Sequence, residues 1–151
     1  MRYLNKIVFI NSAAIRYSEV QLDGNIHLIG TQGVGKSTIL RAILFFYNAD
    51  KLRLGIPKEK RSYDEFYLPY ANSFIVYEVM RENGPYCVMA FKQQGRVAYR
   101  FIDAPYQSSW FVNERREVRA DWISIRKAIG TETQIKSSGI LFSATIVVPI
   151  S

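Results

Sequence analysis

The sequence predicts an α/β fold in which a glycine-rich loop joins a strand to a helix and an antiparallel β-meander follows. Two observations support this prediction. An apolar segment, a loop with three glycines and a stretch of helical periodicity succeed one another over residues 25–47. Three apolar runs separated by turn residues lie between residues 74 and 102. A chain of 151 residues can bury one sizeable core, so we expect a single domain over residues 1–151.

The composition is that of a soluble globular protein. Hydrophobic residues make up 48% of the chain and charged residues 22%, which excludes a wholly disordered chain. No apolar run approaches the roughly 18 residues that span a membrane, and the apolar residues 7–10 are too few for a secretory signal. The single cysteine, Cys87, and the single histidine, His27, exclude an internal disulfide and a Cys/His metal cluster. We therefore expect a cytoplasmic protein.

The first third of the chain is expected to hold three strands and a helix. Residues 6–10 predict a buried strand, and residues 20–22 predict the end of a second strand that turns at Asp23-Gly24. Residues 25–29 predict a third strand that leads into the glycine loop. Apolar side chains at helical spacing then predict a helix over residues 37–47 with one face toward a core.

Residues 48–72 are predicted to be irregular because they contain glycine and proline breakers. Four aromatic residues in this stretch are spaced as on one face of a helix: Tyr63, Phe66, Tyr67 and Tyr70. This spacing favours a small helix that packs aromatic rings into the core over a platform that stacks nucleic-acid bases.

The formal charge of +7 is unevenly spread. Residues 51–61 carry five basic side chains and one acidic one, a net charge of +4 in eleven residues. A solvated basic loop and a surface that faces phosphates are equally compatible with this composition.

The second half of the chain predicts strands followed by a helix. Residues 74–80, 86–91 and 97–102 form the expected meander, and residues 110–112 are expected to add a short strand. Asp121 is a candidate N-cap for a helix over residues 122–129 that ends at Gly130. Residues 140–142 and 145–148 could form strands, but residues 131–151 as a whole are expected to be a non-native or disordered tail.

The motif that carries chemistry is Gly30-Thr-Gln-Gly-Val-Gly-Lys-Ser-Thr38, which satisfies the pattern G-x-x-x-x-G-K-[ST]. Three glycines let the backbone curl so that successive N–H groups point inward at an anion, and the N-terminus of the following helix adds its dipole. The side chain of Lys36 is expected to reach the β- and γ-phosphates, and the Ser37 hydroxyl to bind Mg²⁺. The expected ligand is therefore a nucleoside triphosphate, ATP or GTP, with Mg²⁺. The nucleotide-binding residues that the motif predicts are Gly30, Gln32, Gly33, Val34, Gly35, Lys36, Ser37 and Thr38.

Two strands ahead of the loop, the loop itself and the Arg-Ala-Ile element of residues 41–43 resemble the start of SMC-type ATPase heads (structural maintenance of chromosomes), including MukB-like and Wadjet-type relatives. Gln32 stands where this family usually has Asn, and the Leu52-Arg53 pair is similar to an element whose arginine reaches the nucleotide or DNA. The resemblance implies the N-terminal lobe of a head with the P-loop NTPase fold. Its implied partners are the C-terminal lobe of the same head, a second head across the nucleotide, and DNA at a basic surface.

The catalytic apparatus of that family is not visible in this sequence. The resemblance implies a Walker B acidic pair, a signature helix and a switch histidine, all of which follow a long coiled coil. No catalytic residue is therefore assigned, and little hydrolysis is expected of this chain alone. Glu78 is interpreted as part of the alternation of a strand, His27 as a core histidine and Cys87 as a small buried hydrophobe.

Two other functions remain open from the sequence. The glycine loop also suits a self-contained small-molecule kinase or nucleotidase, in which Arg53 and Arg61 could act as lid residues. The basic residues 51–61 also suit a nucleic-acid-binding module in which the loop motif is incidental.

Overall fold

The chain folds around one sheet in the computed structural model, which describes residues 2–12, 15–22, 42–43, 67–119, 121–137 and 146–147. The strands run in the order β2-β1-β3-β4-β5-β6, and each neighbouring pair along this order is antiparallel. The short β7 pairs with β1 in parallel. The elements are β1 (Arg2–Ser12), β2 (Ile15–Gln21), β3 (Phe74–Met80), β4 (Tyr86–Gln93), β5 (Arg96–Ile102), the 3₁₀ helix η2 (Ser108–Trp110), α3 (Trp122–Ile129), β6 (Ile135–Ser137) and β7 (Ile146–Val147).

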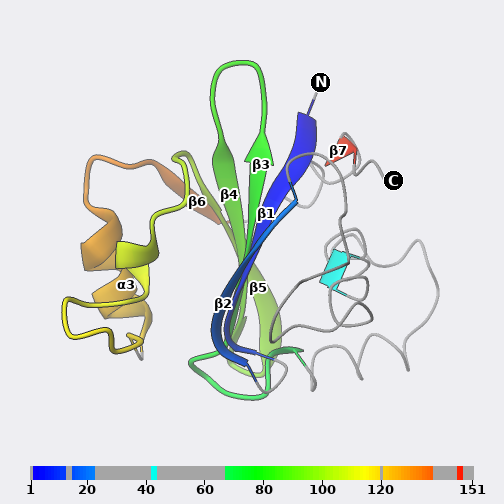
Figure 1. The fold of residues 1–151 in the computed structure, drawn as a ribbon. Coiled ribbons are helices and arrows are strands. Elements are labelled where there is room, and N and C mark those ends of the chain that lie inside the picture. Colours follow the sequence, from blue (N-terminus) through cyan, green and yellow to red (C-terminus); the bar gives the residue numbers. More distant parts are fainter. Residues whose placement is uncertain are drawn as a thin grey trace.

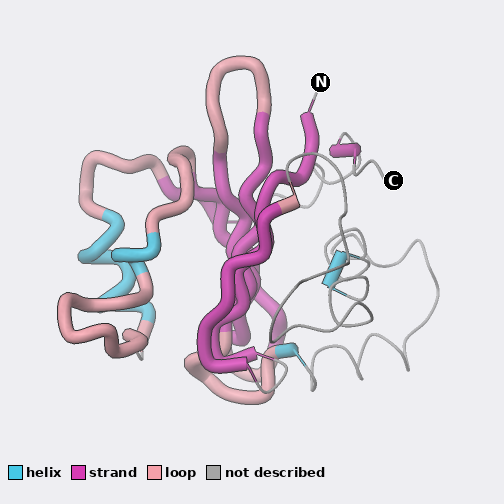
Figure 2. Tube along the Cα trace, viewed as in Figure 1, coloured by secondary structure: helices cyan, strands magenta, loops and turns pink. Residues whose placement is uncertain are grey.

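This architecture corrects the predicted fold class. An α/β P-loop NTPase fold is wrong for this chain, because the described part is mostly an antiparallel sheet with a single helix, α3, given from end to end. The meander of β3, β4 and β5 was expected beside an α/β core. Instead, β3 pairs directly with β1, and the meander forms the body of the sheet (Figures 1 and 2). Antiparallel neighbours need only short connections, whereas a parallel sheet needs crossover helices, and none links β3, β4 and β5.

Strand β1 lies inside the sheet between β2 and β3. Four consecutive apolar residues of this strand, Ile7–Ile10, are all 0% exposed. A strand that is buried on both faces shows a continuous apolar run instead of alternation, and this is why the short run at residues 6–10 correctly predicted a buried strand. The strand is longer than predicted, because it extends through polar residues at both ends.

The two faces of the sheet carry separate cores. One face places Ile7, Phe9 and Tyr77 against a cover that includes Ala42–Ile43 and Tyr67. The opposite face is covered by the segment after β5, including η2 and α3. Figure 1 shows α3 on one side of the sheet and the residue pair 42–43 (cyan) on the other. The members of this second core include Val8, Ile10, Phe74, Val76, Met89, Phe91, Trp110, Phe111, Ile125 and Ile129.

The turns of the meander form where the sequence predicts them. The β4–β5 hairpin turns at Gln94 and Gly95, which both have positive φ, 54° and 77°. Two positive φ values at the centre of a two-residue loop match the right-handed twist of the flanking strands. The turn between β3 and β4 contains Gly84 at a φ of 108°. These glycines have no Cβ, so they adopt such conformations at low cost.

Helix α3 confirms the predicted cap, length and buried face. The Asp121 side chain accepts a hydrogen bond from the backbone N–H of Ser124, and Gly130 ends the helix at a φ of 96°. Ile125 and Ile129 are buried. The third residue of the predicted face, Trp122, stacks on Phe91 of β4 with 5.8 Å between ring centroids, which holds the helix against the sheet.

Two local predictions are wrong. Residues 110–112 are not a strand: Trp110 ends η2, and Val112 forms one isolated bridge with Val118. Of the aromatic stripe, Tyr67 is helical and fully buried, but Tyr70 is 64% exposed. Pro69 lies between them, and because proline lacks the N–H that continues a helix, Tyr70 falls in a turn closed by Ser73. Tyr63 and Phe66 lie outside the described residues.

We expect Asp121→Ala to lower the denaturation midpoint of the chain, because it removes the acceptor for an N–H at the start of α3. Asp121→Asn retains an oxygen acceptor and serves as the matched control with a smaller loss. The hydrogen bond from Ser124 lowers the pKa of the Asp121 carboxyl, so its contribution is present at neutral pH and is lost as the pH falls through the lowered pKa. Urea denaturation at several pH values measures both effects. Equal midpoints for the Ala variant and the wild-type chain at neutral pH would contradict this role.

Candidate functional site

The predicted nucleotide-binding residues lie outside the described residues. These are Gly30, Gln32, Gly33, Val34, Gly35, Lys36, Ser37, Thr38 and Arg53. His27 and the basic residues 51–61 also lie outside them. The assignments to ATP and Mg²⁺ therefore stay predictions from the sequence.

The nearest described residues after the glycine loop are Ala42 and Ile43, four and five positions beyond Thr38. Both are helical, in agreement with the helix predicted there, and they are 0% and 7% exposed. They belong to the apolar core that includes Leu4, Tyr67 and Tyr77. Ala42 and Ile43 are thus packed onto one face of the sheet by apolar contacts.

A hydrogen bond adds to this packing. The Tyr77 hydroxyl, on β3, donates to the backbone carbonyl oxygen of Ala42 at 2.7 Å. Tyr77 is fully buried, and burial is the main reason why its pKa lies well above the ordinary tyrosine value. The phenol therefore stays protonated and keeps its donor across the physiological pH range. This bond fixes a side chain in the centre of the sheet to the backbone that follows the loop.

Glu78, on the same strand, is held in a structural role. Its side chain is 6% exposed, and its two carboxylate oxygens accept hydrogen bonds from Asn5 Nδ2 and from the backbone N–H of Tyr106, both at 2.8 Å. Asn5 is the extra residue of a bulge in β1, where the register with β3 shifts. Both oxygens of the carboxylate are occupied within the protein, as expected for a residue that belongs to the strand and not to a catalytic centre.

Cys87 is a buried free thiol, as predicted. Burial raises the pKa of its thiol well above the ordinary value, and the neighbouring Glu78 carboxylate raises it further. A thiol that stays protonated is a poor nucleophile and a poor metal ligand. Among the residues that the structure describes, no group of three or more His, Cys, Asp or Glu side chains could hold a metal ion.

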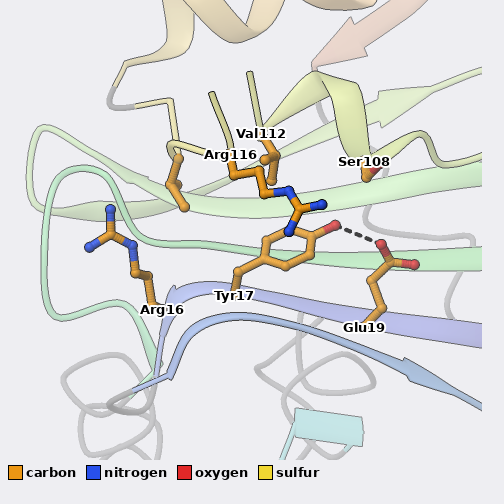
Figure 3. A pocket seen from close by; sticks show the side chains of 7 residues that line it. Arg16, Tyr17, Glu19, Ser108, Val112 and Arg116 are labelled. Carbon is orange, nitrogen blue, oxygen red and sulfur yellow. Dashed lines mark hydrogen bonds between the residues drawn. The ribbon is translucent and has the colours of Figure 1, made fainter. Parts of the chain in front are cut away.

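A second candidate site is a polar cleft of about 500 Å³ between β2 and the segment after η2. We refer to it as the β2 cleft. The residues that line it are Arg16, Tyr17, Glu19, Ser108, Val112, Arg116 and Val118. Figure 3 shows that β2 contributes one wall of the cleft and that Arg116 reaches in from the opposite wall. A cavity of this volume lies within the range of small-molecule sites.

One wall of the β2 cleft is fixed by hydrogen bonds. The Tyr17 hydroxyl lies 2.7 Å from Glu19 Oε2 and 2.8 Å from the Tyr106 hydroxyl. Lys6 Nζ forms an ion pair with the other oxygen of Glu19 at 3.3 Å. Burial raises the pKa values of both phenols above the ordinary tyrosine value, so both stay neutral. The carboxylate of Glu19 is therefore already paired with a cation and a phenol.

The sequence does not predict this second site. Arg16, Tyr17 and Glu19 lie on β2, of which only the last residues were predicted, and their partners are about 90 positions away along the chain. Asn113 is the available local signal, because asparagine often closes tight turns, and the turn that it closes carries Arg116. Nothing in the spacing of the residues indicates that this turn faces β2.

The described residues thus form an antiparallel sheet that is covered on both faces, with a polar cleft at the β2 edge. The chain belongs to a family described as "Protein of unknown function (DUF3584)", which matches residues 11–143. No curated protein and no solved structure matches it. In the part of the chain that the structure describes, no helix is both long and apolar enough to cross a membrane.

We expect Tyr77→Phe to destabilise the chain by about 1 kcal/mol, because it removes one buried hydrogen bond while leaving the ring in place. Guanidinium denaturation measures the change. Tyr70→Phe, at a tyrosine that is 64% exposed, controls for the general effect of removing a phenolic hydroxyl. A Tyr77→Phe chain as stable as the wild-type chain would show that the contact with Ala42 adds nothing.

Proposed function

We propose that the chain binds ATP and Mg²⁺ through residues 30–38 and forms the ATP-binding part of an SMC-like ATPase that processes DNA. The observation that carries the proposal is the motif G-x-x-x-x-G-K-[ST] in these residues. The helical and buried state of Ala42–Ile43 supports it, because a helix is expected directly after such a loop. The family to which the chain belongs is described without an activity.

In the proposed site, each residue type has a separate task. The backbone N–H groups around Gly33 and Gly35 bind phosphate oxygens, Lys36 neutralises the β- and γ-phosphates, and Ser37 supplies a hydroxyl ligand to Mg²⁺. Thr38 donates to the α-phosphate. Gln32 and Arg53 are proposed as further nucleotide-binding residues, with Arg53 at the periphery of the site.

Phosphate binding is a local property of a loop and of the first turn of the helix after it. It depends on main-chain N–H groups and one lysine, and it does not require helices on both faces of a parallel sheet. Binding of ATP by the loop is therefore compatible with the antiparallel sheet that the structure shows. What the loop needs from the rest of the chain is a fixed helix, and the contact of Tyr77 with Ala42 is suited to that task.

Hydrolysis is proposed to need groups from outside this chain. Glu78 is the buried carboxylate among the described residues, and both of its oxygens are already occupied. A base that activates water and a cation that stabilises the transferring phosphoryl group would come from a second lobe and from a second head across the nucleotide. DNA is the proposed partner of the basic residues 51–61.

We expect Lys36→Ala to weaken binding of a nonhydrolysable ATP analogue by about tenfold or more, because it removes a charge-assisted contact with the phosphates. Arg53→Ala should weaken binding less, since Arg53 is placed at the periphery. Isothermal titration calorimetry with Mg²⁺ present measures both affinities. Lys58→Ala, another basic residue of the same region of sequence, is the control for nonspecific loss of charge.

Three results would count against the proposal. The analogue fails to bind the wild-type chain, Lys36→Ala binds it as tightly as the wild-type chain does, or Arg53→Ala has the larger effect. Multiple-turnover ATPase activity of the 151-residue chain that is lost in Glu78→Gln would contradict the assignment of hydrolysis to groups outside the chain.

A further inference from the structure

We propose that the β2 cleft binds a small organic phosphate monoester, with its phosphate at Arg116 and its apolar body against Tyr17, while Arg16 adds positive charge on the other side of the Tyr17 ring (Figure 3). This site is distinct from the glycine loop. Tyr17, Val112 and Val118 pack against the core on the α3 side of the sheet, whereas Ala42–Ile43 pack against the core on the opposite face. The inference therefore does not depend on nucleotide binding at residues 30–38.

The charge of the β2 cleft favours an anionic ligand. Of the three charged side chains that line the cleft, Glu19 is already compensated by Lys6 and by the Tyr17 hydroxyl. The side chains of Arg16 and Arg116 make no hydrogen bond or ion pair among the described residues. Because neither guanidinium group has a partner among the described residues, the part of the cleft that the structure describes carries an uncompensated charge of +2. That charge matches a phosphate monoester, which is close to a dianion at neutral pH.

The backbone at Arg116 has a φ of 63°. This left-handed conformation is unfavourable for an arginine and is usually left to glycine or asparagine. A tight turn enforces it: Arg116 N–H donates to the Asn113 carbonyl oxygen, and Asn113 Oδ1 accepts from the N–H groups of Arg115 and Glu117, each at 2.9 Å. The turn thus projects a cationic side chain from a fixed and costly position, a combination typical of functional residues.

Beside the arginines, the β2 cleft has an apolar surface. The ring of Tyr17 is held in place because its hydroxyl bonds both Glu19 and Tyr106. Val112 and Val118, joined by a bridge, add an apolar surface, and Ser108 adds a hydroxyl. Figure 3 shows the Tyr17 ring, Ser108 and Arg116 around the same space. An apolar wall beside a cationic end suits a ligand with a compact apolar or planar body and one phosphate.

The test uses phenyl phosphate as the probe and isothermal titration calorimetry of the full chain. We expect Arg116→Asn to weaken binding by about tenfold or more, because it loses a charge-assisted contact, and Arg16→Gln to weaken binding less, because it removes positive charge on the other side of the Tyr17 ring. Asparagine tolerates the left-handed conformation, so Arg116→Asn should fold at least as stably as the wild-type chain, which separates binding from folding. Arg115→Gln, in the same turn but outside the cleft, is the matched control and should keep the wild-type affinity.

Further arms identify the ligand chemistry and the location. Lys36→Ala should leave the affinity for phenyl phosphate unchanged, and benzoate should bind more weakly because a carboxylate carries one charge. The proposal is overturned if phenyl phosphate does not bind the wild-type chain, if Arg115→Gln weakens binding as much as Arg116→Asn does, or if Lys36→Ala abolishes binding. Tighter binding of benzoate than of phenyl phosphate would overturn the assignment to a phosphate.

Discussion

The burial of β1 on both faces is the constraint on which the rest of the structure depends. Ile7 and Phe9 belong to one core and Val8 and Ile10 to the other, so β1, like its neighbour β3, contributes side chains to both apolar layers. Its neighbours β2 and β3 pair with it in fixed register. A slip of one residue would exchange the two sets of side chains between the cores, so this register also fixes which residues face each candidate site.

The polar features of the fold are arranged around the same strand. Asn5 forms a bulge in β1, and its side chain meets the buried carboxylate of Glu78. Glu78 in turn accepts the backbone N–H of Tyr106, the residue whose hydroxyl bonds Tyr17 in the cleft wall. The carboxylate therefore links the centre of the sheet to the segment that covers it. Loss of such a buried acceptor would leave two donors without partners, which costs more than a surface hydrogen bond contributes.

The sequence predicted the local elements well and their assembly poorly. The alternation and turn residues of β3, β4 and β5 and the cap of α3 are local signals, and the structure confirms them. The fold class was wrong because the glycine loop suggested an α/β architecture, while the pairing of β1 with β3 joins residues about 70 positions apart. No local pattern encodes such a pairing. The stripe of aromatics failed at Tyr70 because Pro69 outweighed the helical spacing.

The two candidate sites differed in the same way. The glycine loop is a contiguous motif and could be found in the sequence, although its residues lie outside the described part of the chain. The β2 cleft combines residues of β2 with residues of a distant turn, and only the folded chain brings them together. Ala42 and Ile43, which follow the loop in the sequence, and the apolar residues of the β2 cleft pack on opposite faces of the sheet.

The central claim is that the phosphate-binding loop is anchored to one face of the sheet through Ala42 and Tyr77. Backbone amide chemical shifts, followed while a nonhydrolysable ATP analogue and Mg²⁺ are added, test this claim most directly. The account predicts that the signals of Ala42, Ile43 and Tyr77 shift with a single affinity and that those of Tyr17 and Arg116 stay in place. Shifts confined to Tyr17 and Arg116, or no shift at Ala42 and Ile43 at saturation, would contradict it.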